Sequence, residues 1–309
     1  MLTFRSIAKI ANPPYLFRPI QMANRVWREL TWRSSDREVV RLPWGLAIVI
    51  NPHEAIGHNI ATRGVYDLAV TETLWRLPDP GELVVDAGAN IGYTASLLAV
   101  RAGARGRVLC FEPHPEVFVC LQENVSAWKD DARCGAFLLR QTALGGASSV
   151  STLETSDSFG HNRGTARVAA ADRRSAGGLS VQVERLDDVL RPSEEIGVMK
   201  IDAEGAELEI LRGMQAILAA RRVRDIVFEE TNGYPAATHK FLASRGYMVF
   251  GLQAGLFGVR CLRDAPPKIV AQGDPPNYLA TIAPERALER LGRPGWRSFG
   301  ILSGIGADN

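Results

Sequence analysis

The segment that most constrains the fold is residues 83–93, where three consecutive apolar residues lead into a glycine-bearing turn and then into a helical pattern. The short apolar run has the length of a buried strand. Gly88 and Gly92 lack a Cβ, so the backbone there can turn tightly and let a ligand come close. Asp86 stands where the strand should end. This order of strand, glycine turn and helix predicts a ligand-binding corner at the carboxyl edge of a parallel sheet.

Strands and helices alternate along the chain that follows. Further strands are predicted at residues 107–111, 136–139, 181–183, 197–201, 225–228, 247–252 and 277–282. Helices are predicted at residues 68–75, 93–102, 115–128, 207–219 and 236–244. Such alternation predicts an α/β fold of the doubly wound, Rossmann-like type, a mostly parallel sheet with helices on both faces. The Ser- and Gly-rich stretch 148–180 lacks a strong period and is interpreted as a loop or short hairpins.

The 309 residues are enough for one large α/β domain with extensions. Prolines interrupt residues 1–65, so this stretch is expected to be an N-terminal extension without long elements. Residues 66–284 carry the alternating pattern and are expected to form the main domain. Residues 285–309 are expected to be a glycine-containing C-terminal tail.

Composition excludes several classes of protein. Lys and Arg number 36 against 34 Asp and Glu, a formal charge of +2 that argues against a dedicated nucleic-acid surface. The four cysteines show no metal-ligand spacing, which favours reduced thiols and a cytoplasmic location. No run of about 18 apolar residues occurs, so no transmembrane segment is expected. The sequence predicts no particular oligomeric state.

The first 28 residues mix basic and apolar side chains. The favoured interpretation of this arm is packing against the main domain. The alternative is an amphipathic segment that makes peripheral contact with a membrane surface or with a partner.

An acidic residue, Glu112, stands at the end of the second predicted strand, shortly after the glycine turn. An acid in this place can accept hydrogen bonds from both hydroxyls of a ribose, as it does in dinucleotide-binding folds. The dinucleotide fingerprint would place a glycine at position 90, where this chain has Asn90. Three interpretations stay open from these residues: a nucleoside cofactor with an amino-acid part held near Asp86, the nicotinamide dinucleotide of an oxidoreductase, and a non-catalytic binding or scaffold protein.

A third segment, residues 198–213, reads Val-Met-Lys-Ile-Asp-Ala-Glu-Gly-Ala-Glu and continues as a helical pattern. Together with residues 86–93 and 111–116 it closely resembles the FkbM family of S-adenosylmethionine-dependent methyltransferases, whose hallmark is lysine-isoleucine-aspartate, any residue, glutamate-glycine-alanine-glutamate. The resemblance covers roughly residues 66–284. It implies the class I methyltransferase fold, S-adenosylmethionine as cofactor, and O-methylation of a small-molecule or glycan acceptor, namely a sugar, glycolipid or polyketide-type metabolite.

The resemblance also assigns residues to the cofactor. The turn after the first strand would line its methionine end, Glu112 would hold the ribose, and residues 141–144 would flank the adenine. The expected cofactor-binding residues are Asp86, Gly88, Ala89, Asn90, Gly92, Glu112, Pro113, Thr142, Ala143 and Asp202.

Methyl transfer from a sulfonium is an in-line displacement, so the enzyme mainly aligns a nucleophile and removes its proton. Asp202 ends a predicted strand beside the expected methyl position, Glu204 follows in the loop, and His161 lies in the Ser/Gly-rich stretch. These three are the predicted catalytic residues. For Glu204 the alternative is an acidic first helical turn that complements the helix dipole. For His161 the alternative is an ordinary surface histidine.

A metal site is a further alternative. Glu229, Glu230 and Asn232 end the next predicted strand, and with Asp202 they carry the oxygen ligands that divalent cations prefer. The plainer interpretation is that one acid faces the acceptor pocket and the other faces solvent. We therefore expect no metal ion in the site.

Overall fold

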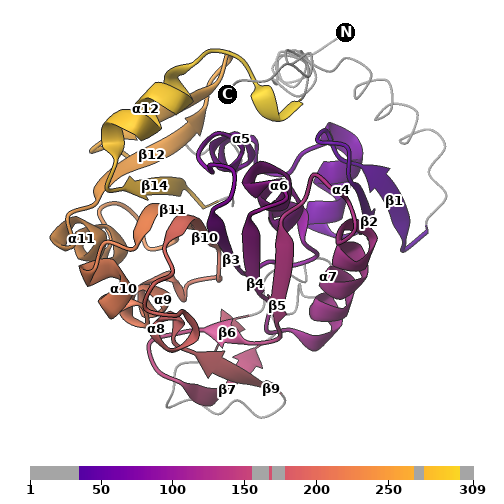
Figure 1. Cartoon of the computed structure of the whole chain (residues 1–309), viewed down its shortest axis with the longest axis horizontal. Helices are drawn as coiled ribbons and strands as arrows, with labels where there is room; N and C mark the ends of the chain where they lie inside the picture. Colours follow the sequence, from indigo (N-terminus) through magenta and orange to yellow (C-terminus); the bar gives the residue numbers. More distant parts are fainter. Residues whose placement is uncertain (1–34, 155–166, 169–177, 268–274, 300–309) are drawn as a thin grey trace, which may run out of the picture.

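The structure is a computed structural model that describes residues 35–154, 167–168, 178–267 and 275–299. An eight-stranded sheet occupies its centre (Figure 1), with the strand order β13-β12-β14-β11-β10-β3-β4-β5. The strands are β3 (Leu83–Ala87), β4 (Arg107–Phe111), β5 (Ala136–Arg140), β10 (Ile196–Ile201), β11 (Val223–Glu229), β12 (Met248–Ala254), β13 (Val259–Arg263) and β14 (Asn277–Thr281).

The strand directions create a switch point in the middle of the sheet. Strands β5, β4, β3, β10 and β11 are parallel neighbours, whereas β14 is antiparallel to both β11 and β12. From β3 the chain moves outward through β4 and β5, and it then returns to pair β10 on the other side of β3. Open α/β sheets bind ligands outside the carboxyl ends of the strands at such a reversal. The site is therefore expected where β3 and β10 end.

Alternate residues of the strands contact two hydrophobic clusters, one on each face of the sheet. Val84 and Val108 belong to one cluster, and Val85 and Leu109 belong to the other. The first cluster includes residues of α5 (Leu68–Arg76), α6 (Tyr93–Ala102) and α7 (Pro115–Trp128), together with residues of α4 (Ala55–Arg63) and α12 (Pro284–Gly292). The second includes residues of α8 (Leu186–Val189), α9 (Glu207–Arg212), α10 (Gln215–Ala219) and α11 (Ala237–Ser244). The predicted doubly wound, mostly parallel sheet with helices on both faces is confirmed.

The predicted helix over residues 207–219 is wrong in one respect, because it is two helices, α9 and α10. A Cβ on Gly213 would lie 1.9 Å from the carbonyl oxygen of Gly145, so another part of the chain passes against the backbone at the break. The carboxylate of Asp187 accepts hydrogen bonds from the amides of Ala216 and Ile217, at 3.1 and 3.0 Å. This side chain caps the start of a new helix, an effect of distant residues that the helical period does not show.

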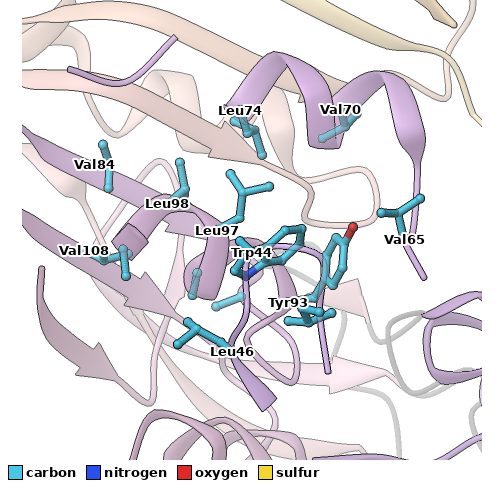
Figure 2. Packing of buried hydrophobic residues seen from close by; sticks show 14 of the residues in the cluster. Trp44, Leu46, Val65, Val70, Leu74, Val84, Tyr93, Leu97, Leu98 and Val108 are labelled. Carbon is cyan, nitrogen blue, oxygen red and sulfur yellow. The ribbon is translucent and has the colours of Figure 1, made fainter. Parts of the chain in front are cut away.

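Residues 35–65, within the predicted N-terminal extension, form three short elements. Strands β1 (Glu38–Arg41) and β2 (Ala47–Ile50) form an antiparallel hairpin, and helix α4 (Ala55–Arg63) follows. Figure 2 shows the Trp44 indole beside the Tyr93 ring, with a centroid separation of 5.4 Å. The Trp44 indole N–H also donates to Ser96 Oγ at 3.0 Å. The expected boundary near residue 65 therefore separates two segments that share one hydrophobic core.

Residues 284–299, in the segment expected to be a tail, form helix α12 (Pro284–Gly292) and the 3-10 turn η2 (Arg297–Phe299). A buried ion pair between Glu72 and Arg76 fastens this segment to α5. Glu72 accepts hydrogen bonds from the amides of Arg297 and Ser298, and Arg76 donates to the carbonyl oxygen of Gly295 at 2.6 Å. Partners from α5 thus satisfy backbone groups of the C-terminal segment. Residues 300–309 lie outside the described residues.

A second, smaller sheet has the order β6-β9-β7-β8. Its strands are β6 (Ala143–Leu144), β7 (Ser149–Glu154), β8 (Arg167–Val168) and β9 (Leu179–Glu184). The antiparallel pairing of β7 with β9 and with β8 agrees with the short hairpins predicted there. Most of the intervening residues, His161 among them, lie outside the described residues, so its predicted catalytic role stays a prediction.

The four cysteines are free thiols. Among the described residues, we find no helix with the length and apolar character needed to cross a membrane.

Candidate active site

The turn between β3 and α6 forms a closed set of hydrogen bonds. Each of the five backbone amides of residues 88–92 donates to an acceptor within the protein. Gly88 and Ala89 donate to Phe111 O, Asn90 to Glu112 Oε2, Ile91 to Asn90 Oδ1 and Gly92 to Ala89 O, all at 2.7–3.0 Å. A loop that cradles phosphate keeps such amides for the ligand. This turn therefore lacks the anion cradle of a dinucleotide-binding loop.

The two glycines of the turn are required by the chain itself. Gly88 has φ +79°, and a Cβ there would lie 1.9 Å from the carbonyl oxygen of Asp202. Gly92 has φ +94°, and its Cβ would lie 2.9 Å from Leu121. Asn90 adopts the same left-handed region at φ 49°. The neighbours that these contacts show are the loop after β10 at Gly88 and helix α7 at Gly92, and the predicted approach of a ligand to the two glycines stays a prediction.

Glu112 joins this turn to the loop after β4. Its Oε2 accepts the amide of Asn90 at 3.0 Å, and its Oε1 accepts the amide of His114 at 2.9 Å. Only 7% of Glu112 is exposed, and this burial raises the pKa of its carboxyl to about 7. A carboxylate oxygen has two lone pairs, so each oxygen can accept one further hydrogen bond. The predicted ribose contact is compatible with this geometry.

Lys200 is the site residue that sequence reasoning missed. Its ammonium donates to Gly88 O at 2.9 Å and lies 3.2 Å from Asp202 Oδ2 and 3.5 Å from Asp86 Oδ1. Three acceptors match the three N–H groups of a lysine. Burial alone would lower the pKa of Lys200, but Asp202 and Asp86 outweigh it and raise the pKa above its ordinary value. A lysine in the middle of a strand of otherwise apolar residues was the available signal.

Asp86 lies at the carboxyl end of β3, as predicted, but its side chain is fully buried. Thr94 Oγ1 donates to its Oδ2 at 2.5 Å, and Lys200 faces its Oδ1. Burial raises the pKa of Asp86, while Lys200 and Thr94 act in the opposite direction. Asp86 therefore holds Lys200 and the first turn of α6 in place, and its predicted contact with a cofactor stays a prediction.

Asp202 and Glu229 end the adjacent strands β10 and β11, and a hydrogen bond joins their carboxyl groups. The Asp202 side chain is 35% exposed, so it can reach a ligand. Burial acts to raise the pKa of Asp202, but Lys200 and the hydrogen bond from Glu229 lower it below the ordinary value. Burial and the charge of Asp202 raise the pKa of Glu229 to about 10. The two shifts favour the ionised form of Asp202 and the protonated form of Glu229.

The loop after β10 is held by Glu207. Glu207 Oε1 accepts the amides of Ala203 and Gly205, both at 3.1 Å, and the residue is 3% exposed. Between them, Glu204 has φ 52°, and its carboxylate lies near enough to Glu229 to act on it by charge. Glu204 thus borders the Asp202 site, and its predicted catalytic role stays a prediction.

Glu207→Ala is expected to destabilise the protein by about 1–3 kcal/mol, because two backbone amides of the loop lose their carboxylate acceptor. Glu209→Ala, in the same helix, is the matched control. Glu209 is exposed and paired with Arg212 at the surface, so its loss should cost about 0.5 kcal/mol or less. Urea unfolding of both variants measures the difference, and equal losses would show that Glu207 does not hold the loop.

Glu230 does not join the Asp202 site. Its Oε1 accepts two hydrogen bonds from Asn232, at 2.8 and 2.9 Å, and its charge acts on His239 and Tyr278. Successive side chains of a strand point to opposite faces, so Glu229 and Glu230 diverge. Within the described ranges, no group of three or more His, Cys, Asp or Glu side chains is arranged to hold a metal ion. We assign none of these residues as a metal ligand.

Thr142 and Ala143 follow β5 at the start of the second sheet. Thr142 Oγ1 donates to Glu184 Oε2 at 2.7 Å, and Ala143 is buried in β6. Pro113 lies between Glu112 and the start of α7. The predicted contacts of these three residues with a cofactor stay predictions.

The strand order and the acids at the switch point define a class I methyltransferase fold. The model of the FkbM methyltransferase domain matches residues 86–249, more than half of the chain. The chain belongs to the FkbM methyltransferase family, and the resemblance drawn from its three motifs is confirmed.

Two curated relatives are methyltransferases. Methyltransferase sdnD of Sordaria araneosa is 31% identical over 220 residues, which cover 61% of this chain and 79% of that protein. The hexuronic acid methyltransferase AglP of Haloferax volcanii is 29% identical over 154 residues, which cover 49% of this chain and 57% of that protein. Among solved structures, the methyltransferase FkbM of Methylobacillus flagellatus aligns with a TM-score of 0.44 and 17% identity, covering 64% of this chain and 43% of that one.

Proposed function

We propose that this methyltransferase binds S-adenosylmethionine at the carboxyl ends of β3, β4 and β10 and transfers its methyl group to a hydroxyl of a sugar or similar metabolite. The observation that carries the proposal is the convergence of Glu112, Lys200 and Asp202 on the switch point of the sheet. Family membership supports the methyl transfer, and the name of one relative, a hexuronic acid methyltransferase, agrees with a sugar-type acceptor.

The charges at the switch point fit a cationic cofactor better than a dinucleotide. Asp86, Glu112 and Asp202 are three acids around the single ammonium of Lys200. S-adenosylmethionine carries a positive sulfonium and a positive amino group, which this excess of acids favours. The pyrophosphate of a dinucleotide would bring negative charge beside the same acids and would find the turn amides already bonded.

The residues of the chain can be assigned parts in the reaction. Bound S-adenosylmethionine would supply a methyl group on a positive sulfur, which would keep the carbon–sulfur electron pair when the methyl group passes to the acceptor oxygen. Asp202, ionised and partly exposed, accepts a hydrogen bond from the acceptor hydroxyl and takes its proton. Lys200 contacts both Asp202 and the carbonyl oxygen of Gly88, and it thereby fixes Asp202 relative to the turn after β3. Glu112 accepts the ribose hydroxyls and thereby fixes the position of the cofactor.

Transfer of a labelled methyl group tests the proposal. Neutral sugars, uronic acids and hydroxylated lipids are offered as separate acceptor classes, and unfractionated cell extract serves as the broadest acceptor. Labelled product with an oxygen-linked methyl group is expected. Label found only on nitrogen or carbon would overturn the O-methylation, and an absence of transfer to every acceptor would overturn the proposal.

Affinity for S-adenosylmethionine is expected to rise between about pH 6 and about pH 8, by about tenfold in total. The carboxyl of Glu112 has a pKa of about 7 without ligand, and only its ionised form can accept both ribose hydroxyls. Binding therefore favours loss of the proton, and the gain is complete once pH exceeds that pKa. Calorimetric titration at several pH values measures the dependence.

Glu112→Gln is expected to weaken binding by about 1–3 kcal/mol and to remove this share of the pH dependence. Glu116→Gln, in the exposed first turn of α7, is the matched control and should behave as the unmodified chain. The amine of the ligand titrates equally in all three proteins. An identical pH dependence in Glu112→Gln would show that Glu112 does not hold the ribose.

A further inference from the structure

Asp202 and Glu229 are brought together by the register of two parallel strands. Ile201 of β10 stands opposite Phe228 of β11, so the residues that follow leave the sheet side by side. Their carboxyl groups are hydrogen-bonded to each other. A hydrogen bond between two carboxyl groups requires a proton on one of them, because a carboxylate has no N–H or O–H to donate and two neighbouring carboxylates repel each other.

The surrounding charges decide which carboxyl carries the proton. The Lys200 ammonium lies 3.2 Å from Asp202 Oδ2 and keeps Asp202 ionised. Glu229 faces the negative groups of Asp202, Glu204 and Glu207, with Lys200 further off. On its other side, the register pairs Glu229 with Asn277 of β14, whose neutral amide donates to Asp67. The proton therefore resides on Glu229.

We propose that Glu229 is a positioning residue for methyl transfer, which donates a hydrogen bond as a neutral carboxylic acid and, together with Lys200, fixes the orientation of the Asp202 carboxylate. The inference rests on the proposed function, in which Asp202 accepts the proton of the acceptor hydroxyl. An unanchored aspartate samples several rotamers, and two anchors hold one of them. Glu229 itself need not touch the acceptor.

Two variants at this position distinguish the loss of the hydrogen-bond donor from a change in side-chain volume. Glu229→Gln keeps an N–H donor for Asp202 and is expected to retain the transfer rate to within about threefold. Glu229→Leu fills the space without a donor and is expected to lower kcat about tenfold, while the affinity for S-adenosylmethionine changes less than threefold. Single-turnover transfer and calorimetric titration of the full chain provide the two numbers, and melting curves identify a variant that fails to fold.

A second measurement needs no acceptor. Folded Glu229 keeps its proton up to about pH 10, whereas in the unfolded chain it ionises near its ordinary value of 4.5. The folded state thus binds the extra proton, and its stability falls as pH rises between those values. Gln has no proton to lose, so the melting temperature of Glu229→Gln minus that of the unmodified chain should increase from pH 5 to pH 9, on the order of several degrees.

The outcomes are distinguishable. Failure of the unmodified chain to bind S-adenosylmethionine would overturn the proposed function, whatever the variants do. Binding by all three proteins with equal transfer rates for Glu229→Leu and the unmodified chain would overturn the role of Glu229 alone. A melting-temperature difference that stays constant with pH would show that Glu229 is ionised in the folded protein, and this result would also overturn its role as a hydrogen-bond donor. A slow Glu229→Leu, an active Glu229→Gln and a difference that grows with pH would support the inference.

Discussion

Gly88→Ala is expected to destabilise the protein by about 3–5 kcal/mol, from a left-handed backbone without glycine and an overpacked contact. The added Cβ would lie 1.9 Å from the carbonyl oxygen of Asp202, and neither strand end can move without breaking sheet hydrogen bonds. Because the displaced segment carries Asp202, methyl transfer should also be lost. Urea unfolding and transfer of labelled methyl measure the two effects.

Gly81→Ala is the matched control for this substitution. Gly81 has φ +93°, and nothing lies within 4 Å of the position of its Cβ. Gly81→Ala therefore costs only the free energy of placing alanine in a left-handed backbone, about 1–2 kcal/mol, and its Cβ meets no other atom. Equal losses of stability in the two variants would mean that the contact between the turn and the loop after β10 is not as close as described.

Asp202→Asn is expected to lower the methyl-transfer rate by about 10²-fold or more, which is the usual contribution of a positioned general base. The amide keeps the shape of the side chain and its one oxygen can still accept from Lys200, so the loop should stay folded. The affinity for S-adenosylmethionine should change by only a few fold, because Asp202 acts on the acceptor and the transition state. Single-turnover rates at saturating cofactor separate the two effects.

Two other roles of Asp202 give different results in the same experiment. If Asp202 held a metal ion, a chelator should abolish transfer by the unmodified chain and an added divalent ion should restore it. If Asp202 only supported the loop, Asp202→Asn should melt at a lower temperature and keep its rate per folded molecule. A fully active, metal-independent variant would show that the chemistry lies on another residue.

The parts of the site that sequence could predict are those set by local order. A buried strand, a glycine turn, a helix and a later acid placed Asp86, Glu112 and Asp202 at strand ends, and the parallel sheet brings those ends to one edge. The turn residues lie where the pattern predicts them, and protein contacts require the two glycines. A glycine in a sequence indicates that another group comes close to the backbone, but it does not indicate which group.

Lys200 was missed, and Glu229 was predicted only as an alternative metal ligand or as an acid beside the acceptor pocket, because their roles depend on neighbours distant in sequence. Lys200 can be buried as an ammonium because Asp86 and Asp202 lie beside it. The proton on Glu229 depends on the register of β10 with β11, which places Glu229 next to Asp202. The same holds for the C-terminal helix. Pro284 at its start and the apolar pair Ala287 and Leu291 were visible, but the partners that fasten the segment lie on α5.

The most direct test of the central claim is calorimetric titration of the full chain with S-adenosylmethionine and, separately, with nicotinamide dinucleotides. The expected result is saturable binding of one S-adenosylmethionine per chain, with an affinity that Glu112→Gln weakens by about 1–3 kcal/mol, and no heat from the dinucleotides. Binding of a dinucleotide without binding of S-adenosylmethionine would contradict the account.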